Sequence, residues 1–238
     1  MAERRGRKAT CRDARPLLII MLKEPVMGRV KTRLAREIGW AAATRFARAS
    51  ARTTIARLGR DGRWRVLLAV APDRAARARI WPPGIARTGQ GGGDLGARMG
   101  RLLAPAQRPA LLIGADIPAV TPALIASAFR ALSGHDAVFG PAEDGGYWLV
   151  GLGRRARLPG LFENVRWSSP HALADTLAGI PGARVAFAAR LGDVDDAADY
   201  RRRGAVAARI TPPGRWAPAN PPHPRRGEAP FLLFHCSG

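Results

Sequence analysis

The segment Leu111-Leu112-Ile113-Gly114-Ala115-Asp116-Ile117-Pro118 decides how this 238-residue chain is interpreted. A short apolar run is typical of a buried strand, and this run ends at an acidic residue. A carboxylate at the end of a buried strand is costly unless it is paired or binds a cation. We therefore expect Asp116 to lie at a ligand site. The alternative is an aspartate that caps the turn before Pro118.

Short apolar runs and helical stretches alternate on both sides of this segment. We expect strands at 17–22, 65–71, 110–114, 137–140 and 147–152. We expect helices at 41–58, 94–104, 122–132, 170–178 and 197–208, two of them with a Thr-Pro or Ser-Pro start at 121–122 and 169–170. This alternation predicts an α/β protein with three layers, α/β/α, and a mostly parallel central sheet. Ligands of such sheets bind beyond the carboxyl ends of the strands.

Composition sets the domain organisation. With 47% hydrophobic residues the chain can bury a substantial core, and we expect one folded domain at 16–210. Residues 1–15 are predicted to be a flexible basic tail, and residues 211–238 a proline-rich one. The formal net charge is +21, and most of the excess lies between the tails. Such a field favours nucleotides, phosphorylated substrates or nucleic acid as ligands.

The cysteines and the apolar runs argue against several classes of protein. Cys11 and Cys236 both lie in the expected tails, so we expect no disulfide framework and no cysteine-based metal site. The apolar run at 17–22 is too short to span a membrane, and no signal-peptide pattern precedes it. We therefore expect a cytoplasmic protein without a membrane span.

A basic loop follows the first expected strand and leads into a helix. It contains Lys23, Arg29, Lys31 and Arg33, which can neutralise phosphate charge. Gly28 lets the backbone approach a ligand closely. The P-loop spacing is absent, so a nucleotide would be bound in another way. A solvated basic loop is the alternative.

A loop rich in glycine, Gln90-Gly91-Gly92-Gly93-Asp94, enters another expected helix that contains Arg98. It is expected to be flexible and able to close over a nucleotide. A simple linker is the alternative.

A third loop, Glu143-Asp144-Gly145-Gly146-Tyr147, precedes the last expected strand. Its glycines permit close backbone approach, and its aromatic side chain can stack on a sugar or a base. The alternative is a hairpin turn of the Asp-Gly type with core aromatics.

An acidic stretch, Asp193-Val194-Asp195-Asp196, precedes the last expected helix. Asp196 is a plausible N-cap, while Asp193 and Asp195 share one side if the stretch is extended, so that one of them can reach a metal. Capping and solvation alone are the alternative.

Taken together, these segments resemble the DUF2064 family of bacterial GT-A-type glycosyltransferases, also called radical-SAM/selenodomain-associated transferases. The resemblance covers about residues 17–208. It is carried most specifically by Val30-Lys31-Thr32-Arg33-Leu34 and by Pro141-Ala142-Glu143-Asp144-Gly145-Gly146-Tyr147, with Trp167-Ser168-Ser169 between the latter and the acidic stretch.

The resemblance implies a GT-A (nucleotide-diphospho-sugar transferase) fold and a role for each motif. Asp116 and Asp195 would hold Mg²⁺ or Mn²⁺, and Asp116, Glu143 and Asp144 would be catalytic. The nucleotide and its phosphates would be bound by Lys23, Gly28, Arg29, Lys31, Arg33, Gln90, Asp94 and Arg98. The remaining substrate would be bound by Gly145, Gly146, Tyr147 and Trp167.

Three functions are therefore compatible with the sequence. The first is a metal-dependent transferase that uses a nucleotide-sugar donor and a small-molecule acceptor. The second is a nucleotidyltransferase, similar to guanylyltransferases, that moves a nucleoside monophosphate from a nucleoside triphosphate to a phosphorylated acceptor. The third is a non-enzymatic protein that binds anions or nucleic acid, although no specific nucleic-acid motif is present. The oligomeric state is not predicted by the sequence.

Overall fold

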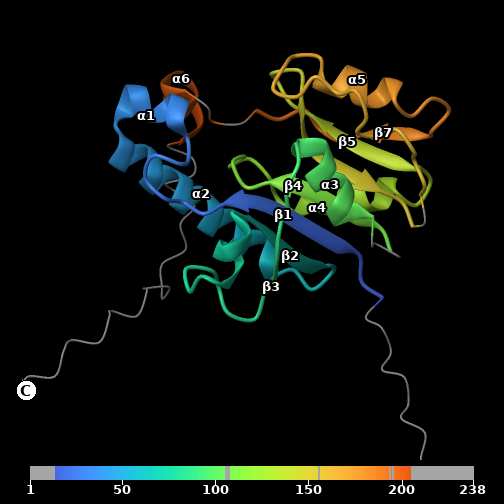
Figure 1. Ribbon diagram of the computed structural model, residues 1–238. Helices are drawn as coiled ribbons and strands as arrows, with labels where there is room; N and C mark the ends of the chain where they lie inside the picture. Colours follow the sequence, from blue (N-terminus) through green and yellow to red (C-terminus); the bar gives the residue numbers. More distant parts are fainter. Residues whose placement is uncertain (1–13, 105–107, 155, 193, 195, 205–238) are drawn as a thin grey trace, which may run out of the picture.

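The computed structural model describes residues 14–104, 108–154, 156–192, 194 and 196–204 (Figure 1). Their centre is a seven-stranded sheet with the order β3-β2-β1-β4-β6-β5-β7. The strands are β1 (Leu17–Lys23), β2 (Arg65–Ala71), β3 (Ala86–Gly89), β4 (Ala110–Gly114), β5 (Ala137–Pro141), β6 (Tyr147–Leu152) and β7 (Val185–Phe187).

The sheet is mostly parallel, as expected. β1 lies between β2 and β4 and is parallel to both, and β3 extends the parallel part. β6 is antiparallel to both of its neighbours, β4 and β5, and β7 is parallel to β5 at the far edge. Among the strands of the described chain, β6 therefore runs against the other six, and the β5–β6 hairpin turns the chain into it.

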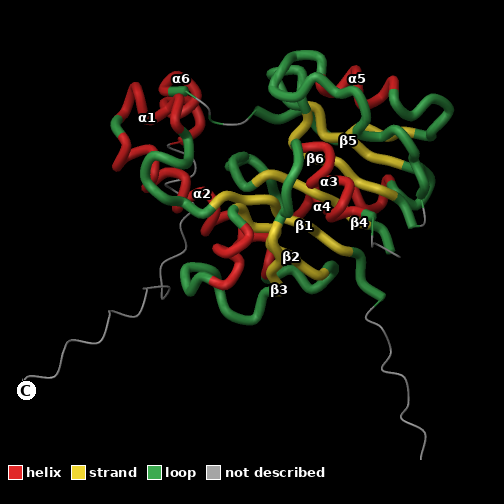
Figure 2. Tube along the Cα trace, in the orientation of Figure 1, coloured by secondary structure: helices red, strands yellow, loops and turns green. Residues whose placement is uncertain are grey.

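Helices cover both faces of the sheet, so the domain has the three expected layers (Figure 2). The helices are α1 (Thr32–Ile38), α2 (Trp40–Gly59), α3 (Leu95–Leu103), α4 (Pro122–Ala131), α5 (Ala172–Ala178) and α6 (Ala197–Asp199), with short 3₁₀ and π segments at Asp73–Arg77 and Tyr200–Gly204. β1 shows how the faces are assigned, because its successive side chains point to opposite sides. Leu18 and Ile20 pack with α2 and α4, while Ile19 packs with α3 and the segment around α5.

A smaller apolar cluster lies beside the sheet, where α1, the first half of α2 and α6 meet (Figure 1). Leu34 and Ala35 of α1 are buried there against Phe46 of α2, whose ring meets the ring of Tyr200 edge to face at 5.3 Å. This cluster fixes α1 and therefore the basic loop that precedes it.

The five expected strands are all confirmed, whereas β3 and β7 were missed. Both are short edge strands: β3 reads Ala-Arg-Thr-Gly, which is not an apolar run, and β7 reads Val-Ala-Phe, which is apolar but only three residues long. Edge strands are only half covered, so the sequence is not forced to be apolar there.

The helix starts were predicted with mixed success. Thr121 is the N-cap of α4, and its Oγ1 accepts a hydrogen bond from the Leu124 N–H at 3.3 Å. The cap expected at Ser169 is wrong, because α5 begins only at Ala172 and the Ser169 hydroxyl donates to the Arg166 carbonyl at 2.6 Å. A tight turn through Trp167 and Ser168, whose φ is 58°, takes the place of the first helical turn.

Parts of the expected organisation fall outside the described residues. These parts are nearly all of the two tails and the end of the helix expected at 197–208. Within the described range that helix is a short α-helical turn, Ala197–Asp199, followed by the π segment Tyr200–Gly204.

Candidate functional site

The site is a cavity of about 650 Å³ at the carboxyl ends of β1 and β4. Its floor is formed by Met21–Lys23 of β1 and by Leu112 and Gly114 of β4, and its walls come from the loop before α1, from α2 and from the start of α3. The next strand along the chain, β2, lies on one side of β1, and β4 lies on the other, so the strand order reverses at β1. Such a switch point is where ligands bind in open α/β sheets.

The chain turns Asp116 toward this cavity by burying its two neighbours. Ala115 is 4% exposed and Ile117 is 6% exposed, and both belong to the core on the α2 face. The Ala115 N–H also donates to the Met21 carbonyl at 3.2 Å, which continues the β1–β4 ladder by one residue. The side chain between them therefore has to point outward, and the Asp116 side chain is 55% exposed.

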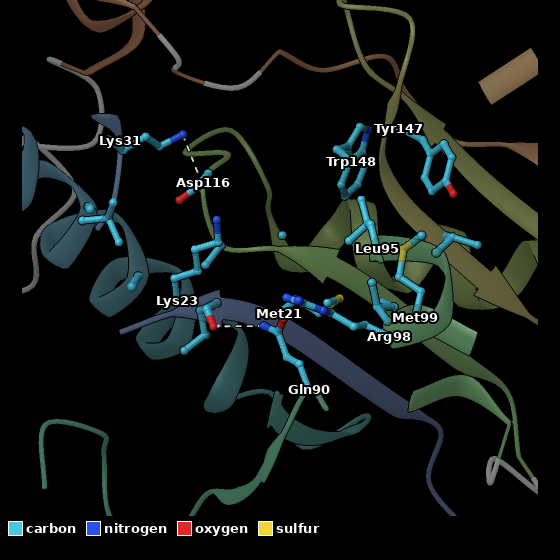
Figure 3. Close-up of a pocket in the computed structure, with 18 of the residues that line it drawn as sticks. Met21, Lys23, Lys31, Gln90, Leu95, Arg98, Met99, Asp116, Tyr147 and Trp148 are labelled. Carbon is cyan, nitrogen blue, oxygen red and sulfur yellow. Dashed lines mark hydrogen bonds and ion pairs between the residues drawn. The ribbon is translucent and has the colours of Figure 1, made fainter. Parts of the chain in front are cut away.

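Asp116 forms an ion pair with Lys31 across the mouth of the cavity. The distance between Lys31 Nζ and Asp116 Oδ2 is 3.1 Å, and the Lys31 side chain is only 6% exposed (Figure 3). Lys31 is the residue before α1 and has a left-handed backbone, with φ 47° and ψ 47°. Non-glycine residues are uncommon in that conformation. The cap expected as the alternative for Asp116 is not its role, because its partner among the described residues is this ammonium group.

Four further cations line the cavity, namely Lys23, Arg29, Arg33 and Arg98. Lys23, Arg29 and Arg33 make no hydrogen bond or ion pair with their side chains anywhere in the described part of the chain, whereas Arg98 Nε donates to the Gly93 carbonyl at 2.9 Å. With Lys31, five cationic side chains face two carboxylates, those of Asp94 and Asp116. The cavity is therefore suited to an anion with several charges.

Gly28 shapes the basic loop from outside the cavity lining. Its φ is 79°, which favours glycine, and a Cβ at this position would meet no atom within 4 Å. The requirement for glycine is therefore the turn itself rather than close packing.

The loop from Gln90 to Asp94 is held in place by side chains, so its expected freedom to close over a ligand finds no support. Gln90 is 5% exposed, and its Nε2 donates to the carbonyls of Leu22 at 3.1 Å and Ala69 at 2.9 Å. Arg101 donates to the carbonyls of Gln90 and Gly92. Asp94 is the N-cap of α3, accepting from the Ala97 N–H at 2.8 Å.

The carboxylates of Glu143 and Asp144 do not line the cavity. Asp144 Oδ1 accepts from the Gly146 N–H at 2.9 Å and closes the β5–β6 hairpin, which is the turn considered as the alternative. Glu143 lines a separate hollow of about 280 Å³ together with Pro118 and Arg190. The Asp116 loop lies between the two hollows, so the structure does not gather the three expected catalytic carboxylates. The roles of Glu143 and Asp144 stay predictions.

The expected substrate residues around Tyr147 pack mostly against one another. The Tyr147 ring lines one end of the cavity, but its hydroxyl lies 3.4 Å from the Thr176 hydroxyl of α5. Burial raises the pKa of the Tyr147 phenol above its ordinary range, and the Thr176 hydrogen bond opposes this only in part. Trp167 meets Tyr147 edge to face at 6.4 Å and lies behind α3 rather than in the cavity.

The local backbone and the packing against Pro170 both require glycine at position 145. Its φ is +84°, and a Cβ there would lie 2.2 Å from the Pro170 carbonyl oxygen. Gly146 has ordinary backbone, and its N–H completes the turn with Asp144. Both glycines therefore lie in the hairpin that carries Tyr147, outside the lining of the cavity.

A metal can be held here by oxygen ligands. The ion pair with Lys31 uses Oδ2 of Asp116, so Oδ1 remains available, and Mg²⁺ is often held by one or two carboxylates together with substrate phosphates. The second expected ligand, Asp195, lies outside the described residues. Within the described ranges no three His, Cys, Asp or Glu side chains gather into a ready-made metal site.

Sequence reasoning missed the contribution of α2. Ser50 Oγ donates to the Ala115 carbonyl at 2.9 Å, and Arg48 reaches the Pro25 carbonyl of the basic loop at 3.3 Å. Arg57 donates to the carbonyls of Pro118 and Val120. The sequence feature that could have revealed this contribution is a set of polar residues on a face of α2 that is otherwise small and apolar.

None of the helices in the described ranges combines the length and the apolar character needed to cross a membrane.

The comparisons with known proteins agree with this architecture. The model of the DUF2064 family, described as an uncharacterized protein conserved in bacteria, matches residues 54–169, which confirms the resemblance over that segment. None of the curated proteins matches the sequence.

Solved structures show the same fold. A candidate nucleotide-diphospho-sugar transferase from Desulfovibrio desulfuricans G20 is 24% identical with a TM-score of 0.71, covering 82% of this chain and 97% of that chain. The inositol-1-phosphate CTP transferase of T. maritima is 14% identical with a TM-score of 0.55, covering 83% and 97% of the two chains. The 4-diphosphocytidyl-2C-methyl-D-erythritol synthase of Anaerococcus prevotii DSM 20548 is 11% identical with a TM-score of 0.54, covering 81% and 98%. The expected nucleotide-diphospho-sugar transferase fold is thus confirmed.

Proposed function

Since residues 54–169 carry the DUF2064 family segment, we propose that this chain is a transferase whose donor is a nucleoside diphosphate sugar and whose reaction depends on Mg²⁺ or Mn²⁺. The observation that carries the proposal is the cavity at the β1–β4 switch point, where Asp116 faces three cations that make no side-chain hydrogen bond or ion pair within the described residues, Lys23, Arg29 and Arg33.

The cations have a direct task in this proposal. A departing nucleoside diphosphate gains negative charge as the glycosidic bond breaks, and fixed cations stabilise that charge most effectively when the site excludes water. Lys23 extends from the end of β1, whereas Arg29 and Arg33 come from the loop and the first turn of α1. The diphosphate is therefore contacted from two sides of the cavity.

Asp116 has the complementary task. Oδ1 of Asp116, which is not in the ion pair, would hold the divalent cation together with Asp195. The cation would supply Lewis-acid stabilisation of the diphosphate. Lys31 keeps the other Asp116 oxygen in place and adds a positive charge beside the phosphates. A small-molecule acceptor would enter from the side of Tyr147 or of Glu143. A general base at Glu143 or Asp144 stays a prediction from the sequence, because neither carboxylate lines the cavity.

A second candidate function is nucleotidyl transfer. The specific observation in its favour is that the fold is shared with an inositol-1-phosphate CTP transferase and a 4-diphosphocytidyl-2C-methyl-D-erythritol synthase, at TM-scores of 0.55 and 0.54. The same cations would then bind a nucleoside triphosphate, and pyrophosphate would leave.

One experiment separates these possibilities. A thermal-shift panel of nucleoside triphosphates and nucleotide-sugars, each with and without Mg²⁺ or Mn²⁺, identifies the donor, because a ligand that binds the native state raises the unfolding temperature. Donors that bind are then incubated with candidate acceptors. Release of a nucleoside diphosphate supports glycosyl transfer, whereas release of pyrophosphate supports nucleotidyl transfer. A protein stabilised by no nucleotide, with or without metal, would contradict both.

A further inference from the structure

One arginine on α2 is placed differently from the many solvated arginines of this chain. Arg57 Nη1 donates to two carbonyls of the loop between β4 and α4, those of Pro118 at 2.9 Å and of Val120 at 2.7 Å. Its other terminal nitrogen, Nη2, is buried and has no hydrogen-bond partner. A buried N–H group without a partner is unfavourable, so this arginine is not placed in the way that best serves stability alone.

The carbonyls that Arg57 holds lie on the same loop as Asp116. A second α2 side chain, Ser50, donates to the carbonyl of Ala115, immediately before Asp116. Ser50 and Arg57 are seven residues apart, which is close to two helical turns, and they therefore point from the same face of α2. The loop is thus fastened to one rigid helix on both sides of its exposed carboxylate.

We propose that Arg57, supported by Ser50, is a positioning residue for Asp116. The inference rests on the proposed role of Asp116 as a ligand of a divalent cation. Arg57 does not line the cavity, so it acts through the backbone of the loop. By fixing Pro118 and Val120, it holds the Asp116 carboxylate at the cavity mouth beside Lys31.

The test uses two substitutions of Arg57. Arg57→Met keeps an apolar side chain of similar length and removes both hydrogen bonds, together with the buried N–H that lacks a partner. Arg57→Lys keeps a cationic donor that can reach part of the same position. Val138→Ala is the control for loss of stability, because Val138 is fully buried in β5, which is not adjacent to β4 in the sheet.

Two quantities are measured on the full-length protein. The first is amide hydrogen exchange at Ala115 and Val120, whose N–H groups are bonded to Met21 and Ile117. We expect exchange at these two amides to be about tenfold faster in Arg57→Met than in Val138→Ala at equal global stability, because the loop opens locally. Arg57→Lys is expected to restore part of the protection.

The second quantity is the affinity for Mn²⁺ alone, measured by electron paramagnetic resonance. Removing a residue that orients a ligand from outside the first coordination sphere typically costs about 10- to 100-fold in metal affinity. We expect a loss of about tenfold in Arg57→Met, partial recovery in Arg57→Lys, and no loss in Val138→Ala.

The outcomes are distinguishable. If Arg57→Met has wild-type exchange at Ala115 and Val120, or if it binds Mn²⁺ as wild type does, the positioning role is wrong. A role in stability alone would lower the unfolding temperature of Arg57→Met while leaving its Mn²⁺ affinity equal to that of Val138→Ala. If the wild-type protein binds no Mn²⁺, either alone or with a nucleoside diphosphate present, the metal role in the proposed function fails, and the positioning of a metal ligand fails with it, whatever the exchange data show.

Discussion

Lys31 Nζ lies 3.1 Å from Asp116 Oδ2, and this ion pair joins the loop after β1 to the loop after β4. The two partners differ in burial, because the Lys31 side chain is 6% exposed and the Asp116 side chain is 55% exposed. A buried ammonium group needs an anion nearby. The pair therefore places a fixed positive charge and a half-exposed carboxylate at one point of the cavity mouth, where the proposed metal ion and diphosphate would meet.

The first prediction concerns Asp116. We expect Asp116→Asn to lower turnover with the donor identified above by about 100-fold or more, because a preorganised charge at the reacting diphosphate is lost. The fold should survive at a lower unfolding temperature, because the buried Lys31 ammonium group loses this carboxylate. Steady-state kinetics and calorimetry measure the two quantities. Asp136→Asn, which removes an exposed ion pair with Arg184, is the matched control. Near-normal turnover in Asp116→Asn would refute the metal role.

The second prediction concerns the cations of α1. Arg33 lines the cavity, whereas Arg36 on the next turn is exposed and does not. We expect Arg33→Gln to weaken nucleotide binding by about tenfold, as is typical for a lost hydrogen bond to a charged group. Arg36→Gln should leave the affinity within about twofold, as expected of an exposed charge. Isothermal titration of both variants at two salt concentrations provides the comparison. Equal losses in the two variants would mean that the site responds only to net charge.

The third prediction concerns the hairpin that carries Tyr147. Gly145→Ala adds a methyl group 2.2 Å from the Pro170 carbonyl oxygen, at a φ of +84°. We expect the free energy of unfolding to fall by at least about 1 kcal/mol, which is the usual cost of forcing a side chain into such a backbone. Gly134→Ala is the control, because its Cβ would meet nothing within 4 Å and its backbone is ordinary. Chemical denaturation of both variants tests this, and equal stability would show that the hairpin adapts.

The fourth prediction concerns pH. Arg166 donates two side-chain hydrogen bonds to Asp175, and this guanidinium lowers the pKa of the Asp175 carboxyl to about 2. The depressed pKa means that the stabilising contact is fully present above about pH 3.8, the ordinary value, and is lost as the pH falls toward 2. We expect Arg166→Gln to raise the pKa of Asp175 only part of the way back to 3.8, because the backbone N–H of residue 166 still donates to Asp175 Oδ2 at 3.0 Å. Carbon-detected NMR titration of the carboxyl group measures it, and an unchanged pKa would assign the shift to another neighbour.

The strands and the location of the site were readable from the sequence for a simple reason. Buried strands such as Ala110–Gly114 have to be apolar over their whole length, so the point at which the chain turns polar marks the carboxyl end. Asp116 and Lys23 were found in this way. The edge strand β3 was missed because a half-covered strand leaves no such apolar run, and β7 was missed because its apolar strand is only three residues long.

Roles that depend on contacts between distant segments could not be read from the sequence. Gln90 and Asp144 look like ligand-binding residues in a glycine-rich loop, yet Gln90 bonds to the backbone of β1 and β2 and Asp144 closes a turn. A polar side chain in a loop has the same sequence signature whether its partner is a ligand or a backbone group. Only the three-dimensional arrangement distinguishes the two.

The sequence by itself determined the α/β alternation, the family resemblance and the presence of an acid beyond β4, because burial and turn chemistry act on neighbouring residues. The tertiary structure alone decided that Lys31, and not a backbone N–H, is the partner of Asp116. It also decided that Glu143 lies on the other side of the Asp116 loop and that α2 fastens this loop through Ser50 and Arg57. These relationships join segments far apart in the chain, and their geometry exists only once the sheet and its helices have packed.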